Sequence, residues 1–148
     1  MNSNSTISEI LGQKGAAVWC ISPDAMVFEA IEMMAVKNVG ALLVTENNKL
    51  VGIISERDYT RKVVLKGKHS RTTAVREVLS SQVVKVTPAH TVQECLRLMT
   101  DHRVRHLPVL DGNRIAGIVS IGDLVNWIIS AQTATISQLQ TYITGVPE

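Results

Sequence analysis

Aromatic side chains are scarce in this sequence: Phe, Trp and Tyr make up only 3% of its 148 residues. Proteins that stack nucleic-acid bases on aromatic rings need more of them, so a single-strand-binding protein is disfavoured. An excess of charge of either sign is also nearly absent, because 15 Lys and Arg stand against 13 Asp and Glu. The net charge of +2 is too small to indicate a nucleic-acid partner.

Cysteine is equally rare, with Cys20 and Cys95 lying 75 positions apart and no CxxC pair. A disulfide scaffold is therefore excluded, and we expect both thiols to be small core residues. Among the four histidines, His102 and His106 are four apart, but the helix predicted there ends between them. No metal site is predicted. No nucleophile–base pair and no GxxxxGK loop is present either, so we do not expect an enzyme.

The sequence also lacks a long apolar run. Its first six residues are neither basic nor apolar, which argues against a signal peptide. Residues 124–147 carry no charge, but their many Ser, Thr, Asn and Gln make them too polar to span a membrane. With 45% hydrophobic and 19% charged residues, we expect a folded cytoplasmic protein.

What the sequence does contain is an internal repeat. Shifting the chain by 65 positions aligns residues 22–63 with 87–128 without a gap, and 12 of 42 pairs are identical. Roughly two or three identities would arise by chance from ordinary compositions. The chain is therefore predicted to be two copies of one unit.

Each copy shows the same pattern of elements. A short strand is followed by Pro, then an amphipathic helix, then two apolar runs joined by a turn, then a second helix. The predicted strands are 17–21, 41–44 and 50–54 in the first copy and 83–86, 107–110 and 115–119 in the second. The predicted fold class is α/β of the α+β type, with the two units packed about a pseudo-twofold axis. Neither copy alone has enough residues for a stable core.

Capping signals mark the starts of the first helices. Thr91 and Glu94 form a capping box in the second copy. Met26 stands where that Thr should be in the first copy, so Asp24 is expected to cap instead. Residues 73–79, between the copies, are expected to form a short helix.

These patterns give a predicted organisation in five parts. They are an N-terminal segment (1–16), repeat 1 (17–66), a linker (67–82), repeat 2 (83–131) and a helical tail (132–148). In the tail Ile129, Ile136, Leu139 and Ile143 recur at roughly helical spacing. We expect the tail to pair two subunits or to dock a partner, although its threonines would also suit a frayed end.

The duplicated motifs resemble those of the CBS (cystathionine β-synthase) domain pair, the Bateman module. They are GIISERD at 52–58, GIVSIGD at 117–123 and VRHLPV at 104–109, and the resemblance covers residues 7–130. The order, spacing and duplication of these motifs make the resemblance specific. It implies a homodimeric regulatory module that binds AMP most readily, or ADP, ATP, NAD or S-adenosylmethionine, in clefts between the repeats. It also implies signalling to another protein, with no catalytic cofactor.

The Ser-x-x-Asp pairs of the two copies allow two interpretations. Ser55 and Ser120 can cap helices whose third residues are Asp58 and Asp123. The resemblance implies that the serines also contact ligand phosphate and the aspartates hold ribose. Capping and binding are compatible, because both use the start of the helix.

The basic residues are distributed unequally between the copies. Arg105 and His106 precede a buried strand and could clamp a phosphate, or could be a solvated strand end. Their counterparts Gly40 and Ala41 would instead let backbone approach adenine. Arg57, in a basic helix with Arg61 and Lys62, could reach a polyphosphate, meet an acidic partner or simply face solvent. The full set implied by the resemblance is Ile21, Gly40, Ala41, Ser55, Arg57, Asp58, Thr87, Val104, Arg105, His106, Ser120 and Asp123.

The alternative is a structural or interaction module with empty clefts. Met26 at the cap position and the absence of a basic residue at Gly40 fit a degenerate first site. Binding of a nucleotide by the purified protein separates the two hypotheses.

Overall fold

The computed structural model describes residues 5–15 and 17–144. The predicted α/β class is confirmed: helices lie against two small sheets. The elements in chain order are α1 (Ile7–Lys14), β1 (Cys20–Ile21), α2 (Val27–Lys37), β2 (Ala41–Glu46), β3 (Lys49–Ser55), α3 (Glu56–Asp58), a π-helix η2 (Tyr59–Val64), a 3₁₀ helix η3 (Val75–Glu77), α4 (Val92–His102), β4 (His106–Asp111), β5 (Arg114–Ser120) and α5 (Ile121–Thr144).

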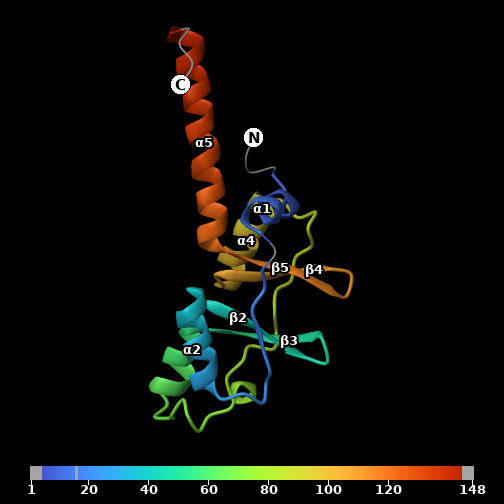
Figure 1. The fold of residues 1–148 in the computed structure, drawn as a ribbon, viewed down its shortest axis with the longest axis vertical. Helices are drawn as coiled ribbons and strands as arrows, with labels where there is room; N and C mark the ends of the chain where they lie inside the picture. Colours follow the sequence, from blue (N-terminus) through green and yellow to red (C-terminus); the bar gives the residue numbers. More distant parts are fainter. Residues whose placement is uncertain (1–4, 16, 145–148) are drawn as a thin grey trace.

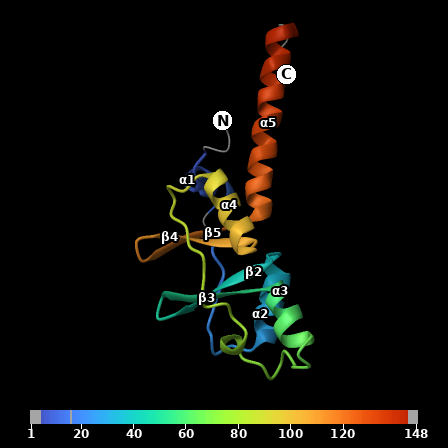
Figure 2. The same ribbon diagram turned by 180° about the vertical axis from the view of Figure 1, so that it is seen from behind.

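Two hairpins form the centre of the molecule, one above the other (Figures 1 and 2). The β2–β3 hairpin pairs with the short parallel strand β1, and the β4–β5 hairpin forms a two-stranded sheet. Helices α2 and α3 lie beside the first hairpin, and α1 and α4 lie beside the second. Each repeat therefore presents its sheet to the other repeat, as the pseudo-twofold arrangement requires.

The two repeats agree in the bounds of their elements and in individual backbone angles. Helices α2 and α4, strands β2 and β4, and strands β3 and β5 have bounds that differ by 65 positions. Asn38 and Arg103, which end the two helices, both have φ of 55°. Both hairpins carry a register shift at the same place, directly after Val44 and directly after Val109. The two copies therefore share one backbone design.

The first strands of the copies are shorter than predicted. Residues 17–19 are not part of β1, and in 83–86 only Val86 makes an isolated bridge, to Val109. One difference between the copies has a chemical cause. Leu43 donates its N–H to Trp19 O at 3.2 Å, but its counterpart is Pro108, which has no N–H to donate. The first strand of the second repeat therefore lacks the corresponding hydrogen bond.

The segments that lead into the repeats cross over to the opposite repeat. Ile7 and Ile10 of α1 belong to the core of the second repeat, whereas Val75 and Val78 belong to the core of the first. The backbone pairs in the same way, with Thr6 bridging Thr91 and with residue 74 bridging residue 26. Segments 6–11 and 74–79 are therefore structural counterparts, offset by 68 positions. The sequence analysis did not predict α1.

The capping predictions had mixed outcomes. The Thr91–Glu94 box is confirmed, with each side chain bonded to the other residue's amide. The expectation for Asp24 was wrong. Met26 caps α2 without a side-chain bond, and Asp24 instead pairs with Arg76 at 3.0 Å. The expected helix at 73–79 is only the 3₁₀ turn η3.

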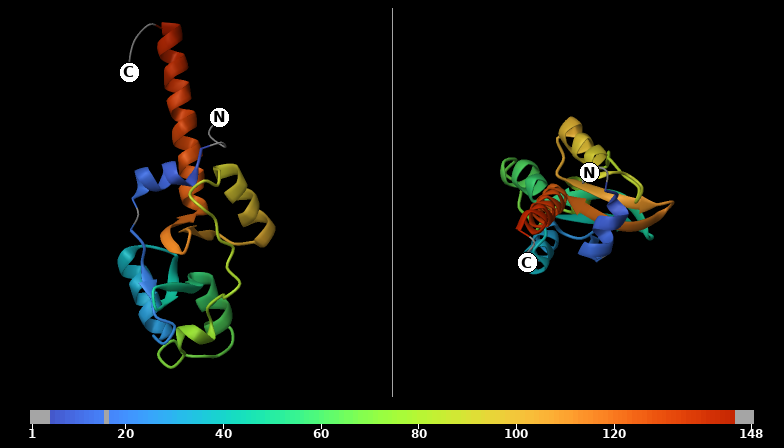
Figure 3. Two further views of the ribbon diagram at one scale, coloured as in Figure 1. Left: turned by 90° about the vertical axis from the view of Figure 1, so that its right-hand side faces the viewer. Right: turned by 90° about the horizontal axis from the view of Figure 1, so that it is seen from above.

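The longest helix, α5, begins at the end of β5 and extends beyond the body of the molecule (Figures 1 and 3). Its first turns pack on the second repeat through Leu124, which is fully buried. Farther along, Ile129 and Leu139 are 54% and 57% exposed. Among the described residues, no helix combines the length and the apolar character needed to cross a membrane.

Candidate functional site

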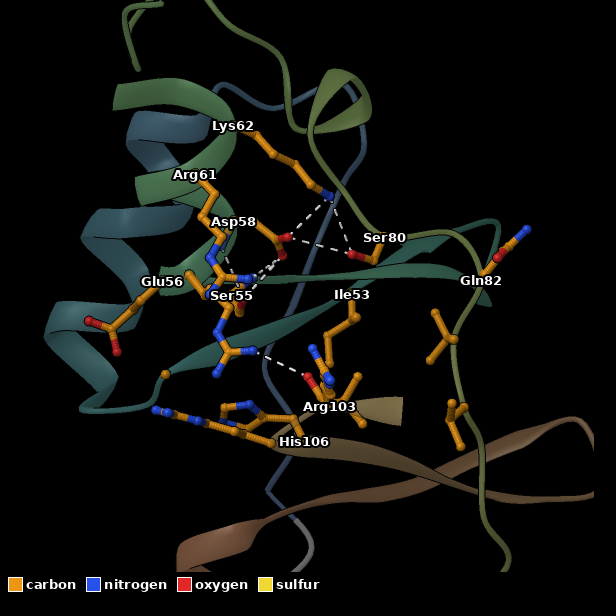
Figure 4. A pocket seen from close by; sticks show the side chains of 16 residues that line it. Ile53, Ser55, Glu56, Asp58, Arg61, Lys62, Ser80, Gln82, Arg103 and His106 are labelled. Atoms are coloured by element: carbon orange, nitrogen blue, oxygen red, sulfur yellow. Dashed lines mark hydrogen bonds and ion pairs between the residues drawn. The ribbon is translucent and has the colours of Figure 1, made fainter. Parts of the chain in front are cut away.

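A cavity of about 350 Å³ lies where the two repeats meet (Figure 4). Its walls come from three parts of the chain, namely the end of the first repeat's hairpin with its second helix, the linker, and the start of β4. The lining residues are Gly40, Ile53, Ser55, Glu56, Arg57, Asp58, Arg61, Lys62, Ser80, Gln82, Val83, Val84, Arg103, Val104, Arg105 and His106. The volume falls within the range of small-molecule sites.

Asp58 is an acidic group of this cavity that several hydrogen bonds hold in place. Its Oδ2 accepts the amide of Ser55 at 2.9 Å and the Ser55 hydroxyl at 3.1 Å, while the Asp58 amide returns a bond to Ser55 Oγ. Its Oδ1 lies 3.1 Å from Lys62 Nζ and 3.5 Å from Ser80 Oγ. The capping interpretation is thereby confirmed, and one carboxylate oxygen still faces the cavity groups. Of the two basic residues that follow on the same helix, Lys62 is the one paired with Asp58.

Positive charge dominates the lining. Five side chains are cationic at neutral pH and two are anionic. The cations are Arg57, Arg61, Lys62, Arg103 and Arg105, against Glu56 and Asp58. Partly enclosed charges of one sign focus the electrostatic potential in a cleft. The cavity is therefore suited to an anionic ligand, and its guanidinium groups suit phosphate.

Arg57 and Arg103 connect the repeats at this cavity. Arg57 Nη1 donates to the main-chain oxygen of Arg103 at 3.2 Å. Arg103 ends α4 in the left-handed conformation, and the Val104 amide bonds back to Met99 O at 3.0 Å. This cap turns the chain so that residues 104–106 enter the cavity wall.

His106 is the imidazole of the cavity wall. Burial lowers its pKa, and the cations Lys14, Arg105 and Arg57 act in the same direction, while Asp123 opposes them. A Cβ on Gly40 would lie 3.5 Å from the imidazole carbon Cε1. Gly40 therefore lies in van der Waals range of the His106 ring across the boundary between the repeats. The neutral imidazole can donate or accept a hydrogen bond there.

In the second repeat the corresponding aspartate is paired with a different lysine. Ser120 and Asp123 form the same cap, with distances of 2.8 and 3.1 Å. However, Lys14 of α1 donates to Asp123 Oδ2 at 2.6 Å and to Ile118 O at 2.8 Å. The cavity beside this pair measures about 160 Å³. Burial raises the pKa of Asp123, but the bonds from Lys14 and Ser120 outweigh it and lower that pKa overall.

The structure brings together seven of the twelve residues selected from sequence. They are Gly40, Ser55, Arg57, Asp58, Val104, Arg105 and His106. Ser120 and Asp123 lie at the counterpart position instead. Ile21 and Ala41 are buried strand residues, 7% and 5% exposed, and Thr87 bonds to His90 on a surface turn. None of these last three is among the residues that line the large cavity.

Several residues that line the cavity were not predicted as site residues. Among them are Arg103 and, from the segment between the repeats, Ser80, Gln82, Val83 and Val84. A signal was available for Arg103, because it directly precedes the motif at 104–109. No comparable signal marks residues 80–84, since the path of an irregular segment cannot be read from periodicity.

The cysteines lie away from this chemistry. Cys95 is fully buried in α4, and burial raises the pKa of its thiol to about 11. Cys20 is exposed at β1, contrary to the expectation of a core residue. Within residues 5–15 and 17–144 there is no group of three or more His, Cys, Asp or Glu side chains arranged to hold a metal.

Comparison with known families gives a consistent result. A family model described as CBS domain matches the chain twice, at residues 16–65 and 75–130. The CBS domain-containing protein CBSX3, mitochondrial, of Arabidopsis thaliana is 37% identical over 152 residues, covering 96% of this chain and 73% of its own length. The CBS domain-containing protein YhcV of Bacillus subtilis is 36% identical over 104 residues, covering 70% and 74%.

Solved structures show the same fold. A putative signal-transduction protein with CBS domains from Burkholderia ambifaria superimposes with a TM-score of 0.84 at 44% identity, covering 86% of this chain and 96% of its own. The CBS domain structure NE2398 gives 0.82 at 46%, covering 84% and 98%. The CBS domain pair of MJ0100, solved with 5-methylthioadenosine and S-adenosyl-L-methionine, shares the fold with a TM-score of 0.77 at 21% identity, covering 86% and 98%.

Proposed function

The chain belongs to the CBS domain family and carries two CBS repeats, and from this premise we propose that it is a regulatory module that binds an adenine nucleotide between its repeats. The observation that carries the proposal is the cavity of about 350 Å³, lined by five cations and by the Ser55–Asp58 pair. The nucleotide's phosphates would meet the cations and its ribose would meet Asp58. The MJ0100 pair, with its two adenosine compounds, supports the same ligand class for this fold.

The charge of the lining ranks the candidate ligands. AMP, ADP, ATP and NAD carry phosphates that Arg57 and Arg105 can bind through charge-assisted bonds. S-adenosylmethionine carries a sulfonium cation and no phosphate, so it is the weakest candidate for this cavity. AMP is the simplest ligand that satisfies the cations, the Asp58 carboxylate and the apolar wall at Val83 and Val84.

Each group in the site would have a separate task. Lys62 sits on Asp58 in the free protein and would turn towards a phosphate, releasing Oδ1 to accept the ribose hydroxyls. Arg105 and His106 would approach the phosphate from the opposite repeat. Val104, at the bend before β4, would present its main-chain oxygen to the adenine amino group, because its amide is bonded to Met99 O. Titration calorimetry with AMP on the wild type and on Asp58→Asn tests this arrangement.

We also propose that the second partner of the module is another copy of itself, joined along α5. In the sequence Val125, Ile129, Gln132, Ile136, Leu139 and Ile143 alternate at spacings of four and three. This is a heptad seam with Ile at every a position, the pattern of a parallel two-stranded coiled coil. Val125, Ile129 and Leu139 are 41%, 54% and 57% exposed, so the described chain leaves these positions open.

Two further features favour a second copy over a different partner. Residues 124–144 carry no charge that could select an acidic or a basic surface, whereas an apolar seam is complementary to itself. A helix of 24 residues is about 36 Å long, and α5 extends beyond the body of the molecule (Figure 3). Light scattering should give a dimer for the wild type and a monomer for Ile129→Lys. Ser130→Lys, one position off the seam, should remain dimeric; a dimeric Ile129→Lys would contradict the pairing.

A further inference from the structure

The two clefts of this module have the same backbone but different cations on their ribose-binding carboxylates. In the first cleft Asp58 pairs with Lys62, four residues later on the same helix. The counterpart of Lys62 in the second repeat is Trp127, which cannot supply a cation. Asp123 is paired instead with Lys14, which belongs to α1.

Lys14 occupies the position where a ligand would have to enter. Its ammonium bonds both to Asp123 and to the main-chain oxygen of Ile118. Ile118 and Asp123 are the counterparts of Ile53 and Asp58 in the first repeat. Ile53 and Asp58 both line the large cavity. In the first cleft the segment that leads into the other repeat brings Ser80 beside the carboxylate instead, with its hydroxyl 3.5 Å from Asp58 Oδ1. Each carboxylate is therefore held by a lysine, but of the two lysines only Lys14 comes from α1 and also bonds to the strand that precedes the helix.

The helix that carries Lys14 is firmly held. Ile7 and Ile10 are 0% and 3% exposed in the second core. A Cβ on Gly117 would lie only 2.8 Å from Leu11 Cδ2, so α1 lies directly against β5. Ile7 and Ser8 also donate their amides to His90 O and Pro88 O at 2.9 Å. Lys14, in the last turn and one-third exposed, is free to move its long side chain while the helix stays in place.

We propose that Lys14 is the residue that makes this module bind one nucleotide per chain, by holding Asp123 and closing the second cleft. The inference rests on the proposed nucleotide function of the first cleft. A nucleotide that enters the second cleft must first break the Lys14–Asp123 pair. Hydrogen bonds to charged groups are commonly worth about 1.5–3 kcal/mol, which corresponds to about ten- to hundredfold in affinity.

The test is a calorimetric titration of the full chain with AMP. The wild type should bind one equivalent, with any second equivalent at least about tenfold weaker. Lys14→Gln removes the cation and keeps a polar side chain, and should strengthen the second equivalent by about ten- to hundredfold. Lys14→Arg keeps a cation and should behave as the wild type. Lys66→Gln, an exposed lysine in the turn after η2, is the matched control and should change nothing.

The outcomes separate this inference from the function on which it rests. Loss of the second equivalent in Lys14→Gln/Asp123→Asn would place it in the second cleft, as proposed. A wild type that binds one AMP while Lys14→Gln also binds one, or two equal sites in the wild type, would overturn the inference and leave the nucleotide function intact. A second equivalent weakened by Lys14→Gln would also overturn it, since Lys14 would then hold the ligand. No binding of AMP by wild type, Asp123→Asn or Lys14→Gln would contradict the nucleotide function itself. Melting temperatures within about 3 °C of the wild type would show that the variants fold.

Discussion

Arg57 Nη1 in the first repeat donates a hydrogen bond to the main-chain oxygen of Arg103 in the second, across 3.2 Å. Both residues line the large cavity. A phosphate in that cavity would compete for the same guanidinium. If the proposed ligand binds there, its occupancy would alter one of the bonds between the repeats, which would be a means of signalling.

The first prediction concerns the phosphate side of the cavity. Arg105→Ala should weaken AMP binding by about ten- to hundredfold, because it removes a charge-assisted bond. Calorimetry measures the change, with Arg114→Ala as the control. Arg114 lies on the tip of the second hairpin, 78% exposed and paired with Asp111. Equal loss in both variants would mean that net charge, rather than a local contact, controls affinity.

The second prediction concerns ligand charge. Affinity should rise from adenosine to AMP to ATP and should fall with added salt, because five cations surround the cavity. S-adenosylmethionine should bind at least about tenfold more weakly than AMP. The measurement is a competition series against one fluorescent nucleotide at two salt concentrations. Adenosine binding as tightly as ATP would contradict the assignment of the cations to phosphate.

The third prediction concerns the packing of the linker on the first repeat. A Cβ on Gly52 would lie 2.6 Å from Leu79 Cδ1 and 2.7 Å from the main-chain oxygen of Ser80. That oxygen is fixed by its bond from Ile53 N at 3.0 Å, so it cannot retreat freely. Gly52→Ala should lower the free energy of unfolding by about 1–3 kcal/mol in urea denaturation.

The matched control for that substitution is Gly12→Ala. Gly12 lies within α1, and nothing stands within 4 Å of its added Cβ. This variant should be stabilised by about 0.5–1 kcal/mol, because Ala favours the helix. Destabilisation of both variants to the same extent would show that the close approach at Gly52 is not the cause.

The fourth prediction concerns pH. Burial, aided by nearby cations, holds the pKa of His106 below its ordinary value of 6.5 in the folded chain. As pH falls through 6.5, the unfolded chain takes up this proton and the folded chain does not. The contribution of His106 to stability is therefore complete above that pH and decreases as pH falls towards the folded pKa.

His106→Gln isolates this contribution, because the amide keeps a donor and an acceptor but binds no proton in this range. As the solution is acidified from neutral pH through the ordinary histidine pKa, the variant should lose less of its free energy of unfolding than the wild type. Urea midpoints at closely spaced pH values measure the difference. Parallel stability curves for the two proteins would contradict the depressed pKa.

Much of this architecture follows from the printed sequence. The duplication predicts α2 with α4 and both hairpins, because apolar periodicity and turn residues are strong local signals. Both first strands were overestimated, and in the second repeat part of the reason is Pro108, which lacks the amide that Leu43 has in the first. The π-helical form of η2 has no counterpart in α5, and no local signal distinguishes the two helices in advance.

The candidate site was predictable where a motif repeats or resembles the family. Ser55 and Asp58 belong to a duplicated motif, residues 104–106 belong to the motif at 104–109, and the structure brings them to one cavity. The contact between Lys14 and Asp123 could not be predicted, because the two residues lie 109 positions apart. Their pairing depends on α1 crossing to the opposite repeat, and no periodic pattern encodes such a long-range choice.

The most direct test of the account is the binding of AMP to the wild type and to Asp58→Asn, measured side by side by calorimetry on protein freed of carried-over ligand. Asn keeps one side-chain oxygen, which can still accept the Ser55 amide. It lacks the second carboxylate oxygen and the negative charge, which pair with Lys62 and would accept the ribose hydroxyls. The account predicts one equivalent of AMP bound by the wild type, and affinity lower by at least about tenfold in the variant. No binding by the wild type, or equal affinity in the two proteins, would contradict a nucleotide site at this cavity.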